Sequence, residues 1–324
     1  MLTLRFHSLV TVTPRVPSGG ETLTASSFST GSGGKGANQA VACARLSRPN
    51  PKTTSALSPS TVQVRMVGAV GSDEFGPALI QGMKTDGIDT SGVKVVDDQT
   101  TGVAVILVEE SSGENRILLN PGANHTLQPT DFTTASCLGF PLPDLIIMQL
   151  EIPLPTVLRI LTTAKEAGVD VLLNPAPAVK LPEEAYSAIT HLVVNESEAA
   201  ILTGREVEDV GQEGFEWDVV TQEFLGRGVK NVVVTLGAKG AFFASAGQKG
   251  RYVKAEKVEK VVDTTAAGDT FVGAYAVNVV RRVGKGRVSE EDVRLACRAA
   301  GRTVEKKGAQ SAIPWADEVD RKIS

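Results

Sequence analysis

The sequence predicts an α/β fold, with a mostly parallel sheet covered by helices on both faces and a small, separate β-sheet. Strand and helix patterns alternate regularly from Leu142 onward, which is typical of βα repeats. Between residues 93 and 119, three short β segments follow one another without intervening helices, which indicates a second sheet. The chain has 324 residues, 42% of them hydrophobic, which is enough for a large core.

The composition excludes several classes of function. A formal charge of −4 lacks the basic surplus of a nucleic-acid-binding protein. Cys43, Cys137 and Cys297 are widely separated and suit neither a disulfide framework nor a metal cluster, so we expect a reducing compartment. No apolar run approaches the ~18 residues of a membrane span, and the N-terminus is too short and polar for a secretory signal. We expect a soluble cytoplasmic protein, with the nucleus as an alternative location.

Short apolar runs and the residues that break them predict strands and helices in the first third of the chain. The predicted segments are strands at 2–16, 21–29 and 62–70, and helices at 39–46 and from 71 to about 84. Asp73 is expected to cap the second helix. Residues 48–61 are rich in Pro, Ser and Thr, and we expect an exposed insertion without a site.

The three β segments of the predicted second sheet lie at 93–96, 103–108 and 116–119. We group them with the first two strands in a sheet that would cover the core as a lid. Beyond Leu142, the predicted elements are strands at 145–150, 169–173, 192–194 and 232–236, and helices at 156–166, 183–188, 197–202, 219–225, 296–304 and 314–322.

Polar or glycine-containing residues follow each strand of the predicted parallel sheet. They are Glu151, Asn174 to Ala178, Asn195 to Glu198, and Thr235 to Gly240. Taken singly, Glu151 could start a helix, Glu198 could lie on a solvated face, and the last segment could be a plain turn. Because ligands gather beyond the carboxyl ends of parallel strands, the set together indicates a binding site.

A glycine-rich segment, Gly31 to Asn38, leads into the first predicted helix. It is not a P-loop, because Gly36 stands where a Walker A motif needs Ser or Thr after Gly-Lys. The glycines allow close backbone approach to a ligand, with Lys35 and Asn38 as polar contacts. A structural turn would explain the glycines equally well, but not the Lys and Asn together.

The stretch VVDTTAAGDTFVG, Val261 to Gly273, combines a helix start without bulky side chains with one acid, Asp269. Unpaired N–H groups and the helix dipole make such a start an anion site. An acid placed there suits phosphoryl transfer, in which the N–H groups hold the moving phosphoryl charge and Asp269 takes the proton of the attacking hydroxyl. A capped helix after a turn is the structural alternative.

Six motifs occur in the order in which one known family carries them: GSGGKGANQA, LLNPAPA, VVNESEA, VVVTLGAKGA, VDTTAAGDTFVGA and EKKGAQ. From about Val10 to Ile323, the sequence therefore resembles the ribokinase-like (PfkB-type) carbohydrate kinases. The loop at 33–40 and the segment at 307–310 resemble the members of this family that act on ribose.

The resemblance implies a Rossmann-like three-layer core, formed by residues 34–91 and 122–324. It also implies a β-sheet lid, formed by residues 1–33 and 92–121, that makes a homodimer interface. The implied reaction moves the γ-phosphoryl group of ATP to the 5-hydroxyl of D-ribose, in ribose catabolism. Mg²⁺ is the implied cofactor and K⁺ the implied activator, and no nucleic acid or membrane partner is expected.

The resemblance also assigns roles to residues. Asp269 would be the catalytic base, with Ala266, Ala267 and Gly268 as the anion hole. The sugar would be held by Gly34, Lys35, Gly36, Ala37, Asn38, Glu151 and Asp269. The nucleotide would contact Asn195, Thr235, Leu236, Gly237, Ala238, Lys239, Gly240, Gly268 and Cys297. Glu198 would hold Mg²⁺ through water, and the K⁺ loop would comprise Asp263, Thr265, Thr303, Lys306, Gly308 and Ala312.

The sequence departs from the family at three places. Cys297 stands where the family usually has Asn or His against adenine, and Ala312 replaces a Ser of the cation loop, so a weaker or shifted cation site is expected. In the first strand, the family's Asn-x-Asp falls on residues 6–8, with Ser8 in place of the acid that grips the sugar.

Losing a charged acceptor of a buried sugar costs about 1.5–3 kcal/mol, so we expect a weaker hold on ribose. Two alternatives therefore stay open beside a ribose kinase. One is a kinase of the same family for another sugar or a nucleoside. The other is a catalytically impaired protein that binds a sugar or a nucleotide.

Overall fold

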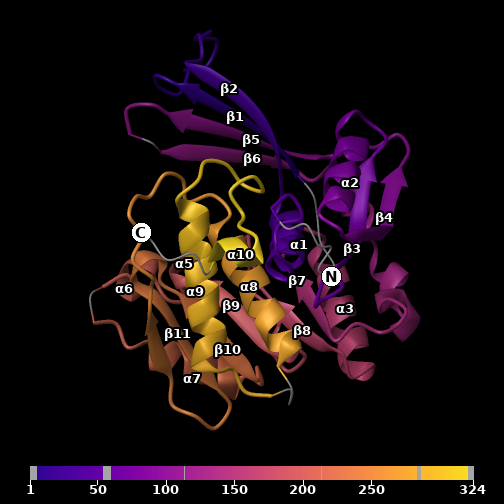
Figure 1. The fold of residues 1–324 in the computed structure, drawn as a ribbon, viewed down its shortest axis with the longest axis vertical. Coiled ribbons are helices and arrows are strands. Elements are labelled where there is room, and N and C mark those ends of the chain that lie inside the picture. Colours follow the sequence, from indigo (N-terminus) through magenta and orange to yellow (C-terminus); the bar gives the residue numbers. More distant parts are fainter. Residues whose placement is uncertain (1–5, 54–59, 113, 213, 283–285, 320–324) are drawn as a thin grey trace.

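The computed structural model describes residues 6–53, 60–112, 114–212, 214–282 and 286–319. Its main sheet has six strands in the order β12-β11-β10-β9-β8-β7 (Figure 1). The parallel strands are β7 (Leu145–Met148), β8 (Asp170–Leu173), β9 (His191–Asn195) and β10 (Asn231–Thr235), and the antiparallel strands are β11 (Gly240–Ser245) and β12 (Arg251–Lys254).

The four parallel strands are nearly continuous apolar runs because both of their faces are buried. Alternate residues enter different clusters: Ile146 and Met148 join one core, and Ile147 joins the other. The first core contains residues of α3 (Leu154–Glu166), α5 (Glu196–Thr203) and α7 (Trp217–Gly226). The second contains residues of α1 (Lys35–Leu46), α8 (Ala267–Arg281) and α9 (Glu290–Val304). The predicted three-layer α/β core is confirmed.

A four-stranded sheet lies apart from the core, at the top of Figure 1. Its order is β2-β1-β5-β6, with β1 parallel to β5 and the other pairs antiparallel. The strands are β1 (Phe6–Thr13), β2 (Ser27–Gly33), β5 (Gly102–Glu109) and β6 (Asn115–Asn120). The predicted small sheet therefore exists, and it corresponds to the segment that we expect to act as a lid.

The remaining strands and α-helices complete the core. They are β3 (Arg65–Gly71), α2 (Phe75–Thr85), β4 (Asp89–Val96), α4 (Glu183–Tyr186), α6 (Val207–Val210) and α10 (Ala316–Val319). Asp73 accepts hydrogen bonds from the N–H groups of Phe75 and Gly76, both 3.2 Å, so it caps α2 as predicted. No helix in the described part of the chain is long and apolar enough to cross a membrane.

Two predictions about the elements are wrong, and two strands were not predicted. The segment at 93–96 belongs to β4, which pairs in parallel with β3 and not with the small sheet, because the strand begins already at Asp89 beside Arg65. β11 and β12 were not predicted. The glycine-rich segment is not a free loop: β2 extends to Gly33 because Gly31 and Gly33 pair with β1, and α1 begins at Lys35.

Parts of three predicted segments lie outside the described residues: 2–5 of the first strand, 54–59 of the insertion and 320–322 of the last helix. The beginning of the insertion is not simply exposed. Arg48 is partly buried, donates to the carbonyl of Asp86 (2.5 Å) and lies over the ring of Trp315 (5.5 Å).

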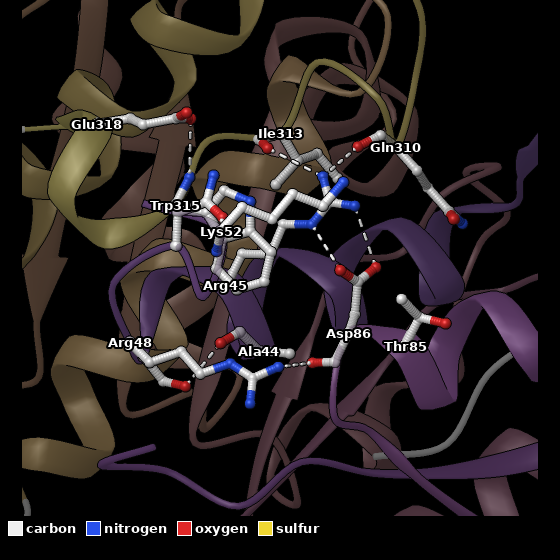
Figure 2. Close-up of polar contacts among 12 residues, drawn as sticks. Ala44, Arg45, Arg48, Lys52, Thr85, Asp86, Gln310, Ile313, Trp315 and Glu318 are labelled. Carbon is white, nitrogen blue, oxygen red and sulfur yellow. Dashed lines mark hydrogen bonds and ion pairs between the residues drawn. The ribbon is translucent and has the colours of Figure 1, made fainter. Parts of the chain in front are cut away.

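Arg45, in the last turn of α1, forms an ion pair and hydrogen bonds with two other parts of the chain (Figure 2). Its guanidinium pairs with both carboxylate oxygens of the buried Asp86, at 2.9 and 3.1 Å. It also donates to the carbonyls of Gln310 (2.6 Å) and Ile313 (3.1 Å). Arg45 therefore fixes the end of α1 against the end of α2 and against the loop before α10.

Helices α1 and α8 cross at very short range. A Cβ atom on Gly273 would overlap Ala42 Cβ and lie 3.0 Å from Cys43 N, tighter than ordinary contact. Cys43 Sγ lies 3.6 Å from the carbonyl of Gly273, which it faces as a donor. The absence of a side chain at Gly273 thus sets the spacing of the two helices.

We predict that Gly273→Ala lowers the free energy of unfolding by about 1–3 kcal/mol, because the added methyl group overpacks the α1–α8 contact. Urea unfolding of the purified protein measures the change. Gly82→Ala is the matched control, since Gly82 lies in α2 with open space around it and should gain about 0.5–1 kcal/mol from the lost chain freedom. A Gly273→Ala protein as stable as the parent would contradict the prediction.

Candidate active site

The carboxyl ends of β7 to β10 and the first turns of α1, α5 and α8 supply the predicted site residues. Asn195 and Thr235 end neighbouring strands and are paired in register. Glu151 follows β7, and Asn174 follows β8. The structure therefore brings most of the predicted residues to one edge of the sheet, as expected for an open α/β fold.

Asp269 lies in the first turn of α8 and is only 8% exposed. Asn38 Nδ2 donates to its Oδ2 (2.8 Å) and Gln39 Nε2 donates to its Oδ1 (3.0 Å). Asn38 Oδ1 is buried and has no hydrogen-bond partner in the described part of the chain. The glycine-rich motif and the acid motif thus meet directly, with one acceptor left over for a ligand hydroxyl.

Glu151 lies beside the start of α1. Its Oε2 accepts from the backbone N–H of Lys35 (3.0 Å). Burial raises the pKa of Glu151 to about 8, partly opposed by the charge of Lys35 and reinforced by that of Asp269. Gly34, just before α1, has a φ of 86°, a left-handed conformation that favours glycine. This turn aims the first N–H groups of α1 at the site.

At the start of α8, one residue has an unfavourable backbone conformation and one backbone N–H group is already hydrogen-bonded. Ala266 has a φ of 61°, which costs a residue with a side chain about 1–2 kcal/mol. The N–H of Ala267 donates to the carbonyl of Thr264 (3.2 Å), so one of the predicted anion-hole donors already has a protein partner. Gly268 is exposed and offers close backbone approach.

The predicted nucleotide and magnesium residues lie around the start of α5. Asn195 Oδ1 accepts from Glu198 N (2.7 Å), and Glu198 Oε2 accepts from Asn195 N (2.9 Å), which forms a capping box. Burial raises the pKa of Glu198, against the opposing effect of the Asn195 N–H bond.

The loop after β10 reaches the same helix. Its residues are Leu236, Gly237, Ala238 and Lys239, followed by Gly240 at the start of β11. Lys239 Nζ lies 3.5 Å from Glu196 Oε1. Thr235 Oγ1 donates to the carbonyl of Val194 (3.3 Å). The loop predicted to contact the nucleotide is therefore adjacent to Asn195 and α5.

Cys297, in α9, is 7% exposed, and burial raises the pKa of its thiol to about 11. It is a buried, neutral side chain. A contact between Cys297 and a nucleotide stays a prediction.

The predicted K⁺ loop is held together by Asp263. Its oxygens accept from the N–H groups of Thr265 and Gly308, both 2.9 Å. Partial burial raises the pKa of Asp263, but these hydrogen bonds outweigh it and lower the pKa below its usual value.

The rest of this loop offers few side-chain oxygens. Thr303 donates to Thr270 Oγ1 (2.8 Å), and Lys306 Nζ lies 3.1 Å from Glu318 Oε2. Ala312 is fully buried and brings no hydroxyl. A cation here would depend on Asp263 and on backbone carbonyls, which are oxygen ligands of the kind that hard cations take.

Among the described residues, no group of three or more His, Cys, Asp or Glu side chains is arranged to hold a metal ion. The carboxylates at this edge, Glu198 among them, suit an ion that keeps several waters and is bound mainly by phosphate oxygens, as Mg²⁺ commonly is.

Three side-chain amides form a hydrogen-bonded network behind Asp269, and the sequence predicted a role for none of them. Gln39 and Gln149 are fully buried, and Asn174 was noted only as a polar residue after a strand. Gln39 Nε2 also donates to Asn174 Oδ1 (3.0 Å), and Gln149 Nε2 donates to Gln39 Oε1. A glutamine inside an otherwise apolar strand or helix, as in LIIMQL and KGANQAVACARL, was the available signal.

Comparisons with known proteins identify the family of the chain. The pfkB family of carbohydrate kinases matches residues 7–316. The chain is 44% identical to a ribokinase of Schizosaccharomyces pombe over 315 residues, 96% of this chain and 93% of that protein. It is 36% identical to a deoxyribokinase of Salmonella typhimurium over 317 residues, 98% and 95% of the two chains. The structure of an Arabidopsis thaliana ribokinase complexed with ribose and ATP is similar, with a TM-score of 0.81, 29% identity and coverage of 98% and 96%.

We predict that Glu151 makes the folded protein less stable as the pH rises from 5 to 8. Its pKa is about 8 in the folded protein and about 4.5 in the unfolded chain, so within this window the folded state binds more protons than the unfolded state. The free energy of unfolding therefore falls with rising pH, and Glu151→Gln should reduce that fall. Urea midpoints at pH 5 and pH 8 test this, with the exposed Glu114→Gln as control. An equal fall in the parent and in Glu151→Gln would contradict it.

Proposed function

Because this chain belongs to the pfkB family of carbohydrate kinases, we propose that it transfers the γ-phosphoryl group of ATP to the 5-hydroxyl of D-ribose. The observation that carries the proposal is the contact of Asn38 with Asp269, 231 residues apart in sequence. It joins the predicted sugar motif to the predicted transfer motif. The complex of a similar ribokinase with ribose and ATP supports the choice of both substrates.

In the proposed step, the 5-hydroxyl gives its proton to Asp269 while its oxygen forms a bond to the γ-phosphorus. The bond between that phosphorus and the β–γ bridging oxygen breaks, and ADP leaves with the electron pair. N–H groups at the start of α8, those of Ala266 and Gly268, would stabilise the charge on the transferring group. Ribose 5-phosphate and ADP are the products, and the proton stays on Asp269 until it is released to solvent.

The sugar would lie between the start of α1 and Glu151. Asn38 Oδ1, buried without a partner in the described part of the chain, can accept from a sugar hydroxyl. Glu151, whose pKa of about 8 keeps a proton available at neutral pH, can both donate and accept. Lys35, Gly34, Gly36 and Ala37 would complete the sugar contacts.

We propose that the nucleotide lies along Asn195, Thr235 and the loop to Gly240. Mg²⁺, held by phosphate oxygens and through water by Glu198, would supply charge neutralisation of the triphosphate. K⁺, at Asp263 and the carbonyls around Thr265, Thr303, Lys306, Gly308 and Ala312, would be an activator.

We also propose that the chain divides into a core (34–91 and 122–324) and a lid (1–33 and 92–121). Strand β4 is the one change to these bounds, because it belongs to the core.

A homodimer through the lid is also proposed. In the small sheet, Ala104 belongs to the first core cluster and pairs in register with Ser8 and Leu119, so this face of the sheet is turned toward the core, although Leu119 at its edge is 48% exposed. The opposite face carries Leu118 and Phe28, each 62% exposed. An exposed apolar sheet face of this kind is typical of a protein–protein contact.

We predict that Asp269→Asn lowers kcat about 10²–10⁴-fold, the usual contribution of a general base. The dissociation constant of ATP should stay within about threefold of the parent, because the loss concerns the transition state. ADP release coupled to a colour reaction gives kcat, and calorimetry gives ATP affinity. Asp97→Asn, in an exposed turn, is the control. Residual activity within tenfold of the parent would rule Asp269 out as the base.

Ser8 decides how tightly the proposed site would hold the sugar. Ser8 faces the core side of the lid sheet, where a carboxylate would accept bonds from two hydroxyls. Ser8→Asp should lower the KM for ribose about tenfold or more, as restoring a charged acceptor does. Ser27→Asp, exposed on β2, should not. Phosphorylation of ribose, 2-deoxyribose, fructose and adenosine is measured in parallel. A preference for 2-deoxyribose would favour a deoxyribose kinase over a ribose kinase. An unchanged KM for ribose in Ser8→Asp would contradict the alignment of Ser8 with the family's acid.

A further inference from the structure

The carboxylate of Asp269 differs from the other buried aspartates. In the described part of the chain, Asp86 and Asp292 are the other two that are buried, and each pairs with an arginine, Arg45 or Arg282. Both oxygens of Asp269 accept instead from side-chain amides. Neutral donors orient a carboxylate without placing a full positive charge against it, and such a charge would weaken it as a base.

One of these amides, Gln39, is connected to three neighbouring strands. It is fully buried, so no part of it reaches solvent. Its Oε1 accepts from Gln149, directly after β7, and its Nε2 donates to Asn174, directly after β8. Asn174 Nδ2 in turn donates to the carbonyl of Val193 in β9 (2.9 Å). The amide that holds Asp269 Oδ1 is therefore fixed by the sheet itself.

We propose that Gln39 is a positioning residue for the phosphoryl transfer: with Gln149 and Asn174, it holds the Asp269 carboxylate in the orientation that accepts the proton of the sugar hydroxyl. The inference rests on the proposed function, in which Asp269 is the base. Asn38 and Gln39 have different roles beside Asp269. Asn38 keeps a free Oδ1 for the ligand, whereas Gln39 uses its oxygen and its nitrogen within the protein.

The charged groups near Asp269 on neighbouring elements are Glu151 after β7 and Glu198 on α5, which interact with it electrostatically, and Lys35 on α1, which interacts with both glutamates. They remain unchanged in all the variants below. A change in the pH dependence of turnover in these variants therefore reports on the amide network.

Gln39→Leu removes the donor to Asp269 Oδ1. It should lower kcat about 10- to 100-fold and leave the KM for ribose within about threefold, because Gln39 does not reach the sugar. Gln39→Glu places a carboxylate against Asp269, which disfavours two negative charges together. The acidic limb of its kcat–pH profile should move to higher pH by at least one unit.

Asn231→Asp is the matched control. Asn231 is a buried amide at the amino end of β10, where it accepts from Ser245 and Val288, on the far edge from the site. It should change stability without moving the pH profile. If a Gln39 variant does not fold, Asn174→Ala, which removes one anchor of Gln39 at a half-buried position, is measured in its place and should lower kcat about three- to tenfold.

Folded Gln39 or Asn174 variants with kcat and acidic limb equal to the parent within twofold and 0.2 pH units would overturn the inference. Asp269→Asn, assayed beside them, separates the two claims. Its inactivity together with unchanged Gln39 variants would refute only the positioning role. Its retained activity would refute the assignment of the base and, with it, the proposed step.

Discussion

The close contact between α1 and α8 is the constraint on which the site depends. Gly273 has no side chain where it faces Ala42, so the two helix backbones approach closely. One turn nearer the N-terminus of each helix, Asn38 and Gln39 meet Asp269. Side-chain amides have a short reach, and hydrogen bonds weaken quickly beyond about 3.2 Å. A wider helix spacing would therefore separate the two motifs without altering either of them.

The sequence predicted the parallel strands well and their neighbours less well. Strands β7 to β10 were located to within two residues, because burial on both faces produces apolar runs bounded by polar residues. The pairing of β4 with β3 could not be predicted, since its alternation suits either sheet and tertiary packing decides the partner. β11 and β12 are antiparallel strands that follow the last βα repeat, so the alternation of strands and helices does not predict them.

Site residues that are charged or that lie next to glycines could be predicted from the sequence. Site residues with neutral amide side chains could not. Lys35, Glu151 and Asp269 were singled out because a charge next to glycines or at a strand end is unusual in a core. Gln39 and Gln149 stand inside apolar segments, where a glutamine is indistinguishable from a tolerated polar residue until its partners are known. Their role depends on contacts between residues more than 100 positions apart, and local sequence carries no information about such contacts.

The charge balance of the site constrains what can bind there. Burial is the main cause of the raised pKa values of Glu151 and Glu198; the charge of Asp269 raises both further, and that of Lys35 opposes the rise. The raised pKa values of the two glutamates show that negative charge is already costly at this edge. A triphosphate brings several more negative charges, and helix N-termini offset only part of them. A triphosphate at this edge would therefore need a divalent cation to offset its charge, which is the part that Mg²⁺ plays in the proposed reaction.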